Sequence, residues 1–131
     1  MEDSLPKNLE DCLNIMARIE SSDEAKWLNL KEKSAMTAAH HGFGTDLRNA
    51  LNLWDPDTEL SKYFRSIGIV HGDDKSGIIM TSYHRFKNGL PLDLEGQLKK
   101  YWKHWKEYAD ELTPPNIEGV DPKYLELFNN M

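Results

Sequence analysis

The sequence predicts an all-α protein, a compact single domain of about six or seven helices. Apolar residues recur at every third or fourth position along most of the chain, which is the periodicity of helices packed on one face. Asp-Pro pairs at 55–56 and 121–122 are typical helix starts. The stretch 78–81 could begin a buried strand, but no partner strand is apparent elsewhere. With 131 residues, the predicted domain is 1–131, with 1–7 and 114–131 at its periphery.

Charge and cysteine content limit the function classes. The chain has 16 basic and 22 acidic residues, a formal net charge of −6, which argues against general nucleic-acid binding and suits a basic protein partner. Its one cysteine, Cys12, cannot form an internal disulfide, so we expect the cytoplasm. No apolar run approaches the roughly 20 residues of a membrane span, and the acidic N-terminus does not resemble a signal peptide. We therefore expect no membrane association.

Two helices are expected before residue 42. The first starts near Asn8, and its apolar face includes Cys12, which we interpret as a packed thiol and not as a nucleophile. The segment 21–24, Ser-Ser-Asp-Glu, has the form of a capping box and should start the second helix. That helix is expected to break near Ser34 and to end at Gly42–Gly44.

Two further helices are expected before residue 71. The third is predicted over 45–54, with Leu47 and Trp54 on its apolar face. Asp55-Pro56 should start the fourth, and Gly68 should end it.

The segment 71–77, His-Gly-Asp-Asp-Lys-Ser-Gly, is predicted to be a polar loop ahead of a fifth helix that ends at Asn88-Gly89. We expect Asp73 or Asp74 to cap this helix, because aspartate oxygens accept the free N–H groups of a first turn. The other aspartate is then available to pair with Arg48.

The sixth helix should follow Asp93 and carry an aromatic stripe at 101, 102, 105 and 108. At helical spacing such a stripe is more often core than surface. Trp102 and Trp105 are nevertheless candidates for an interface, because tryptophan is a frequent anchor of protein–protein contacts. Asp121-Pro122 should start a short final helix.

The polar residues that could carry a function gather in the middle of the chain. This candidate polar cluster comprises His41, Arg48, Asn49, His71, Asp73, Asp74, Ser76, Tyr83 and Arg85. Several of them fall in the pieces His-Gly-Phe-Gly (41–44), Leu-Arg-Asn (47–49), Leu-Trp (53–54) and His-Gly-Asp-Asp-Lys-Ser (71–76).

These pieces resemble a family of small bacterial domains of unknown function. The family pattern is close to H-F-G-x-G-x-x-I-R-N-x-x-x-L-W, followed by H-P-D-D-M-S and a helix. The likeness covers roughly residues 38–90, and the chain departs from it with Gly72 in place of the proline and Lys75 in place of the methionine. The spacing in His-Gly-Phe-Gly is also slightly altered. The resemblance implies a shared fold and a shared polar cluster.

Three interpretations of the cluster stay open. Histidine and aspartate side chains could bind a catalytic metal, but there is no H-E-x-x-H motif and no cysteine pair, so we expect no metal and no other cofactor. Arg48, Lys75 and Arg85 could form an anion site at a helix start, although Asp73 and Asp74 would repel the anion. The favoured interpretation is structural: Arg48 pairs with one of these aspartates and fixes the segment.

We therefore expect a small acidic cytoplasmic bacterial protein that acts by protein–protein binding, as an inhibitor, immunity-type protein or adaptor. The sequence contains no catalytic signature, which favours a protein that is not an enzyme. The alternative is a hydrolase that acts on a phosphate or nucleotide compound through the His/Asp/Arg cluster. An enzyme would need that cluster open in a pocket, whereas a structural network would be buried.

Overall fold

The computed structural model describes residues 6–18, 24–107 and 119–130, without the side chains of His41 and Phe43. Within these residues it is all-helical, as predicted, with eight helices where six or seven were expected. They are α1 (Leu9–Arg18), α2 (Glu24–Leu28), α3 (Glu32–His41), α4 (Phe43–Ala50), α5 (Glu59–Ser66), α6 (Gly72–Lys87), α7 (Leu94–Glu107) and α8 (Pro122–Asn129). None of these helices has the length and apolar character needed to cross a membrane.

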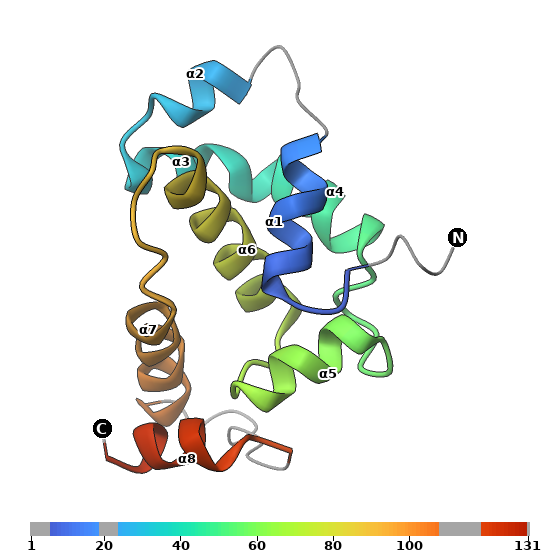
Figure 1. Ribbon diagram of the computed structural model, residues 1–131, viewed down its shortest axis with the longest axis vertical. Coiled ribbons are helices and arrows are strands. Elements are labelled where there is room, and N and C mark those ends of the chain that lie inside the picture. Colours follow the sequence, from blue (N-terminus) through green and yellow to red (C-terminus); the bar gives the residue numbers. More distant parts are fainter. Residues whose placement is uncertain (1–5, 19–23, 108–118, 131) are drawn as a thin grey trace.

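The longest helix, α6, is the centre of the fold (Figure 1). It contacts α1, α3, α4 and α7. A helix with neighbours on several sides buries more than one face, and α6 accordingly buries polar residues together with its isoleucines: Lys75, Ser76, Ile78, Ile79, Ser82 and His84 among others. Each buried polar group needs a partner, because an unpaired one is costly away from water.

The eighth helix arises from an early break in the predicted second one. The break falls at residues 29–31, between α2 and α3, and not near Ser34. The C-terminal part of α6 holds this link, since His84 Nε2 lies 3.1 Å from the carbonyl oxygen of Leu30. Asn88 Nδ2 also donates to the carbonyl of Leu28 at 3.1 Å. The boundary between α2 and α3 is therefore held by contacts between residues 54 and 60 positions apart in the sequence. Local spacing of apolar residues does not reveal such contacts.

The predicted third helix ends early. α4 stops at Ala50, and Asn52 adopts a left-handed conformation with φ of 51°. This turn sends Leu53 into the core and Trp54 outward, with 56% of Trp54 exposed. The next helix, α5, begins at Glu59 and not at Asp55-Pro56, because Thr58 accepts a capping hydrogen bond from the Ser61 N–H at 3.1 Å.

The C-terminal part follows the sequence prediction closely. Gly89 has a positive φ of 71° just after α6, and α8 has Asp121 as its N-cap with Pro122 in the first turn. Trp102 is buried, and its indole Nε1 donates to the carbonyl of Ile67 at 3.2 Å. Gly68 permits this approach, because a Cβ there would lie 2.7 Å from the same nitrogen. Of the predicted capping box at 21–24 only Glu24 is described, as the first residue of α2, and Tyr108 lies outside the described residues.

Candidate functional site

The segment expected to be a loop is the first turn of α6. The helix begins at Gly72, and its N-cap is His71, whose Nδ1 accepts a hydrogen bond from the Asp73 N–H at 3.2 Å. The prediction that Asp73 or Asp74 caps the helix is therefore wrong. Both aspartates lie inside the first turn, where negative charge is favourable next to the free N–H groups.

Arg48 fixes this turn against α4. The arginine is 8% exposed, and its Nε lies 3.3 Å from Oδ1 of Asp73. Its Nη1 donates to Ser76 Oγ at 2.9 Å, and its Nη2 donates to Thr45 Oγ1 and to the carbonyl of His40. Ser76 Oγ in turn donates to the Asp73 carbonyl at 2.9 Å. This arrangement matches the favoured structural interpretation, in which an arginine–aspartate pair anchors the segment.

A glycine makes room for the guanidinium group of Arg48. A Cβ at Gly44 would lie 3.1 Å from Arg48 Nη1 and 3.1 Å from the carbonyl oxygen of Ala39. Any larger residue would therefore crowd both α3 and the arginine. The second glycine of His-Gly-Phe-Gly thus has a packing role in the same network.

Lys75 is a second buried cation on α6. Its Nζ donates to the carbonyl of Leu53 at 2.8 Å and to Ser61 Oγ at 3.0 Å. Burial lowers the pKa of Lys75, and no carboxylate forms an ion pair with it within the described residues. The side chain ties the segment before Trp54 and helix α5 to the first turn of α6. This contact is structural, because the amine is closed off from solvent.

Asp74 joins α6 to α7. Trp105 Nε1 donates to its Oδ2 at 2.8 Å. Burial raises the pKa of Asp74, although the Trp105 hydrogen bond and nearby His71 and His104 oppose the rise. Of the two tryptophans predicted as interface candidates, Trp105 is therefore half-buried beside the cluster, whereas Trp102 belongs to the core.

Four aromatic rings form a continuous line beside this turn, which we call the aromatic strip: Trp54, His71, Trp105 and His104. Ring centroids lie 5.2 Å apart for Trp54 and His71, 5.8 Å for His71 and Trp105, and 5.2 Å for Trp105 and His104. The indole of Trp54 lies on Gly72, where a Cβ would come within 2.7 Å of its ring.

Three of the remaining cluster residues, Asn49, Tyr83 and Arg85, lie elsewhere. Tyr83 is buried, and its hydroxyl donates to a carboxylate oxygen of Glu24. Asn49 is exposed on α4, and the side chain of His41 lies outside the described part of the structure. Arg85 makes two hydrogen bonds to Glu32, at 2.5 and 3.1 Å. The structure thus brings together Arg48, His71, Asp73, Asp74 and Ser76 and separates Asn49, Tyr83 and Arg85 from them.

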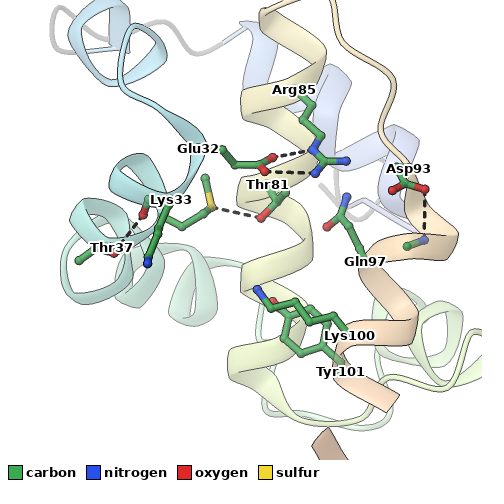
Figure 2. Close-up of a pocket in the computed structure, with 11 residues that line it drawn as sticks. Glu32, Lys33, Thr37, Thr81, Arg85, Asp93, Gln97, Lys100 and Tyr101 are labelled. Carbon is green, nitrogen blue, oxygen red and sulfur yellow. Dashed lines mark hydrogen bonds and ion pairs between the residues drawn. The ribbon is translucent and has the colours of Figure 1, made fainter. Parts of the chain in front are cut away.

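Arg85 lies in a groove of about 570 Å³, which we call the α3–α6–α7 groove (Figure 2). Helix α3 forms one wall, α6 the floor, and α7 with the residue before it the other wall. The lining residues are Glu32, Lys33, Met36, Thr37, Thr81, Arg85, Asp93, Gly96, Gln97, Lys100 and Tyr101. Only Arg85 among them belongs to the predicted cluster.

Sequence reasoning therefore missed the exposure of Trp54 and the groove. Two signals pointed to the turn at Trp54: Asn52, a residue type that tolerates left-handed backbone, and the Asp55-Pro56 pair just beyond. The groove has no comparable local signal, because its walls come from segments more than 40 residues apart. Among the described residues, no group of three or more His, Cys, Asp or Glu side chains could hold a metal ion.

A search of curated proteins and a search of solved structures each gave no match to the chain. A family model does match, over residues 5–87, which reaches from before α1 to the last residue of α6. The match thus includes the Arg48 network and Trp54, whereas α7 and α8 lie beyond it. The model is that of DUF6794, a domain of unknown function, and since it spans more than half of the chain, the protein belongs to this family.

Proposed function

We propose that this chain is a small acidic cytoplasmic bacterial protein that works by binding another protein, as an inhibitor, immunity-type protein or adaptor. The observation that carries the proposal is the exposed indole of Trp54 on the aromatic strip. Tryptophan is among the residue types that contribute most to protein–protein binding, and a large exposed aromatic side chain is costly in water.

Trp54 is held in place before any partner arrives. The preceding residue, Leu53, is fully buried, and its carbonyl accepts a hydrogen bond from Lys75. The indole lies against Gly72, and its plane is nearly perpendicular to the neighbouring ring of His71. A side chain that is already ordered loses little conformational entropy on binding, so more of the contact energy appears as affinity.

The charges around Trp54 favour a basic partner. Asp55 and Asp57 follow the tryptophan directly and are exposed, and the Asp73 side chain is 45% exposed. An arginine or lysine of the partner can stack on the open face of the indole and pair with these carboxylates. The net charge of −6 favours the approach of such a partner.

The geometry supports binding over hydrolysis. Arg48 and Ser76 are buried and hydrogen-bonded to each other, so neither can reach a substrate. The α3–α6–α7 groove, and a second groove lined by Lys99, Lys103, Lys106 and Glu107, include none of Arg48, His71, Asp73, Asp74 or Ser76.

The test is capture of a partner by the immobilised full chain, followed by affinity measurement with the purified partner. Trp54→Ala should weaken binding by about thirtyfold or more, the effect of losing a central anchor. Leu90→Ala is the matched control, because Leu90 is also 56% exposed but lies beyond the C-terminal end of α6. We expect Leu90→Ala to change affinity by less than about twofold.

Two results would overturn the proposal. One is a set of captured proteins that all bind Trp54→Ala as tightly as the parent. The other is release of phosphate from phosphate esters by the purified protein, lost in Asp73→Asn, which would assign the chain to the hydrolases.

A further inference from the structure

The α3–α6–α7 groove has the dimensions of a small-molecule site. Its volume of about 570 Å³ falls within the range of roughly 300–1,000 Å³ that such sites occupy. Each helix contributes residues four apart, which share one helix face: Lys33 and Thr37, Thr81 and Arg85, Gln97 and Tyr101. Three helices therefore direct side chains into one space.

The cations of this groove are unequally neutralised. Arg85 binds both carboxylate oxygens of Glu32 through Nε and Nη2, and its Nη1 donates to the carbonyl of Leu92 at 2.9 Å. Lys33 and Lys100 form no ion pair with a carboxylate of the described residues. The lining therefore has three cations against Glu32 and Asp93, a local excess of positive charge on a chain of net charge −6.

The excess charge acts within the groove. Lys33 lies on the α3 wall, and Lys100 extends from α7 toward α3 (Figure 2). Arg85 is the main cause of the lowered pKa of Glu32, followed by the charge of His84, and the Lys100 charge makes the smallest contribution. Lys33 and Lys100 thus line the same space, in which an anionic ligand would lie.

We propose that the α3–α6–α7 groove binds a small phosphate monoester. Its phosphate lies between Lys33 and Lys100, and its organic part lies against Met36 and the ring of Tyr101. A phosphate ion alone would leave most of the volume to water, so the ligand carries an organic group.

The ion pair between Arg85 and Glu32 favours a phosphate ligand over a carboxylate ligand. A carboxylate ligand is best bound by the two-pronged guanidinium, and Glu32 occupies that position on Arg85. What is left is two lysines, which are point charges with rotating donors and suit a tetrahedral oxyanion. A phosphate monoester carries about −1.5 to −2 charges at neutral pH, which matches two ammonium groups.

The test is to titrate the full chain with three ligands that share one ring: phenyl phosphate, benzoate and phenol. Binding is monitored through the amide chemical shifts of the protein. Phenyl phosphate should shift the amides of Thr37, Thr81 and Gly96 and should bind more tightly than benzoate, with phenol weakest. Lys33→Gln and Lys100→Gln should each weaken phenyl phosphate by about tenfold, the value of one hydrogen bond to a charged group.

Lys103→Gln is the matched control, because Lys103 is on the same helix as Lys100 but lines the other groove. It should change affinity by less than about twofold. Equal loss in Lys103→Gln would indicate general surface attraction, and equal binding of benzoate would refute the phosphate assignment. Absence of binding would refute the site. Trp54→Ala should bind phenyl phosphate like the parent, which separates this test from that of protein binding.

Discussion

Arg48 and Asp73 form an ion pair, but they contribute unequally to the stability of the protein because their side chains differ in exposure. Arg48 is buried and also bonds Ser76, Thr45 and the His40 carbonyl, whereas Asp73 keeps 45% of its side chain exposed. Losing the arginine removes a donor from the buried Ser76 hydroxyl and from two partly buried oxygens, those of Thr45 and of the His40 carbonyl. Losing the aspartate removes one partner of an arginine that keeps the others.

We therefore expect Arg48→Ala to lower the free energy of unfolding by about 3 kcal/mol, the cost of opening a buried charged network. Asp73→Ala should cost about 1 kcal/mol or less, as for partly exposed ion pairs. The double variant should lose less than the sum, because the two residues share an interaction. Urea denaturation of the parent and the three variants measures these values.

Asn49→Ala is the control for this cycle, since Asn49 is the exposed neighbour of Arg48, and it should stay within about 0.5 kcal/mol of the parent. If Arg48→Ala unfolds like the parent, the network does not stabilise the fold, and the cluster would be better explained as a functional site.

The sequence predicted the ion pair of Arg48 with an aspartate but not the N-cap of α6. Arginine and adjacent carboxylates in one motif are readily matched by charge, and Asp73 proved to be the partner. His71 was missed as the N-cap because histidine is rarely counted among capping residues. The hydrogen bonds that close the network come from residues 28 positions apart, Arg48 and Ser76, and no local pattern reports them.

Helices α6 and α7 are joined at their polar residues as well as in the core. The Trp105 indole donates to Asp74, and burial raises the pKa of that carboxyl. The folded state thus holds the Asp74 proton more tightly than the unfolded state does. Stability from this group falls as pH rises from the unfolded pKa, near 3.8, through the raised folded pKa, and the ionised form carries a desolvation cost above it.

Asp74→Asn should therefore unfold at the same temperature as the parent or higher at pH 7. The asparagine oxygen still accepts the Trp105 N–H, and no buried charge remains. Asp74→Ala leaves that N–H without its acceptor and should lose about 1 kcal/mol. Thermal denaturation as a function of pH checks both.

The pH dependence of the Asp74→Asn variant provides a second check. The gap between Asp74→Asn and the parent should narrow on acidification, when Asp74 becomes neutral. A gap that stays constant would show that the charge of Asp74 is not the cause, and that neighbouring His71, Asp73 or His104 must be considered.

The helical character of the segments was predictable, whereas several helix boundaries were not. The polar character of 71–77 suggested a loop, but these residues form a helical turn because Lys75 and Ser76 find partners on other elements. α4 ended before Trp54 because Asn52 takes a left-handed conformation. Periodicity reports which face is apolar, whereas these boundaries depend on contacts and backbone turns that it does not encode.

The two surfaces to which we assign ligands lie on opposite halves of α6. The aromatic strip lies at its N-terminal turn, within reach of acidic residues, and the α3–α6–α7 groove lies along its later turns, with excess lysine charge. The ion pair between Glu32 and Arg85 forms part of that groove and joins α3 to α6. Arg85 also holds the link to α7 through the Leu92 carbonyl.

Glu32→Gln tests how this ion pair contributes to the stability of the whole molecule. The hydrogen bond from Arg85 lowers the pKa of Glu32 below its usual 4.5. The stabilisation is therefore fully present above about pH 4.5 and is lost as pH falls through the lower folded pKa. Because both side chains are partly exposed, we expect Glu32→Gln to cost about 1 kcal/mol or less at pH 7.

The difference between Glu32→Gln and the parent at pH 7 should shrink in acid and vanish at a pH below the lowered folded pKa of Glu32, where this side chain is protonated in both folded and unfolded states. Glu95→Gln is the control, since Glu95 forms an ion pair with Lys99 on the surface of α7 alone, and its loss should be within about 0.5 kcal/mol. Chemical denaturation at both pH values decides the matter. A Glu32→Gln loss that persists in acid would mean that packing of the glutamate, and not its charge, joins α3 to α6.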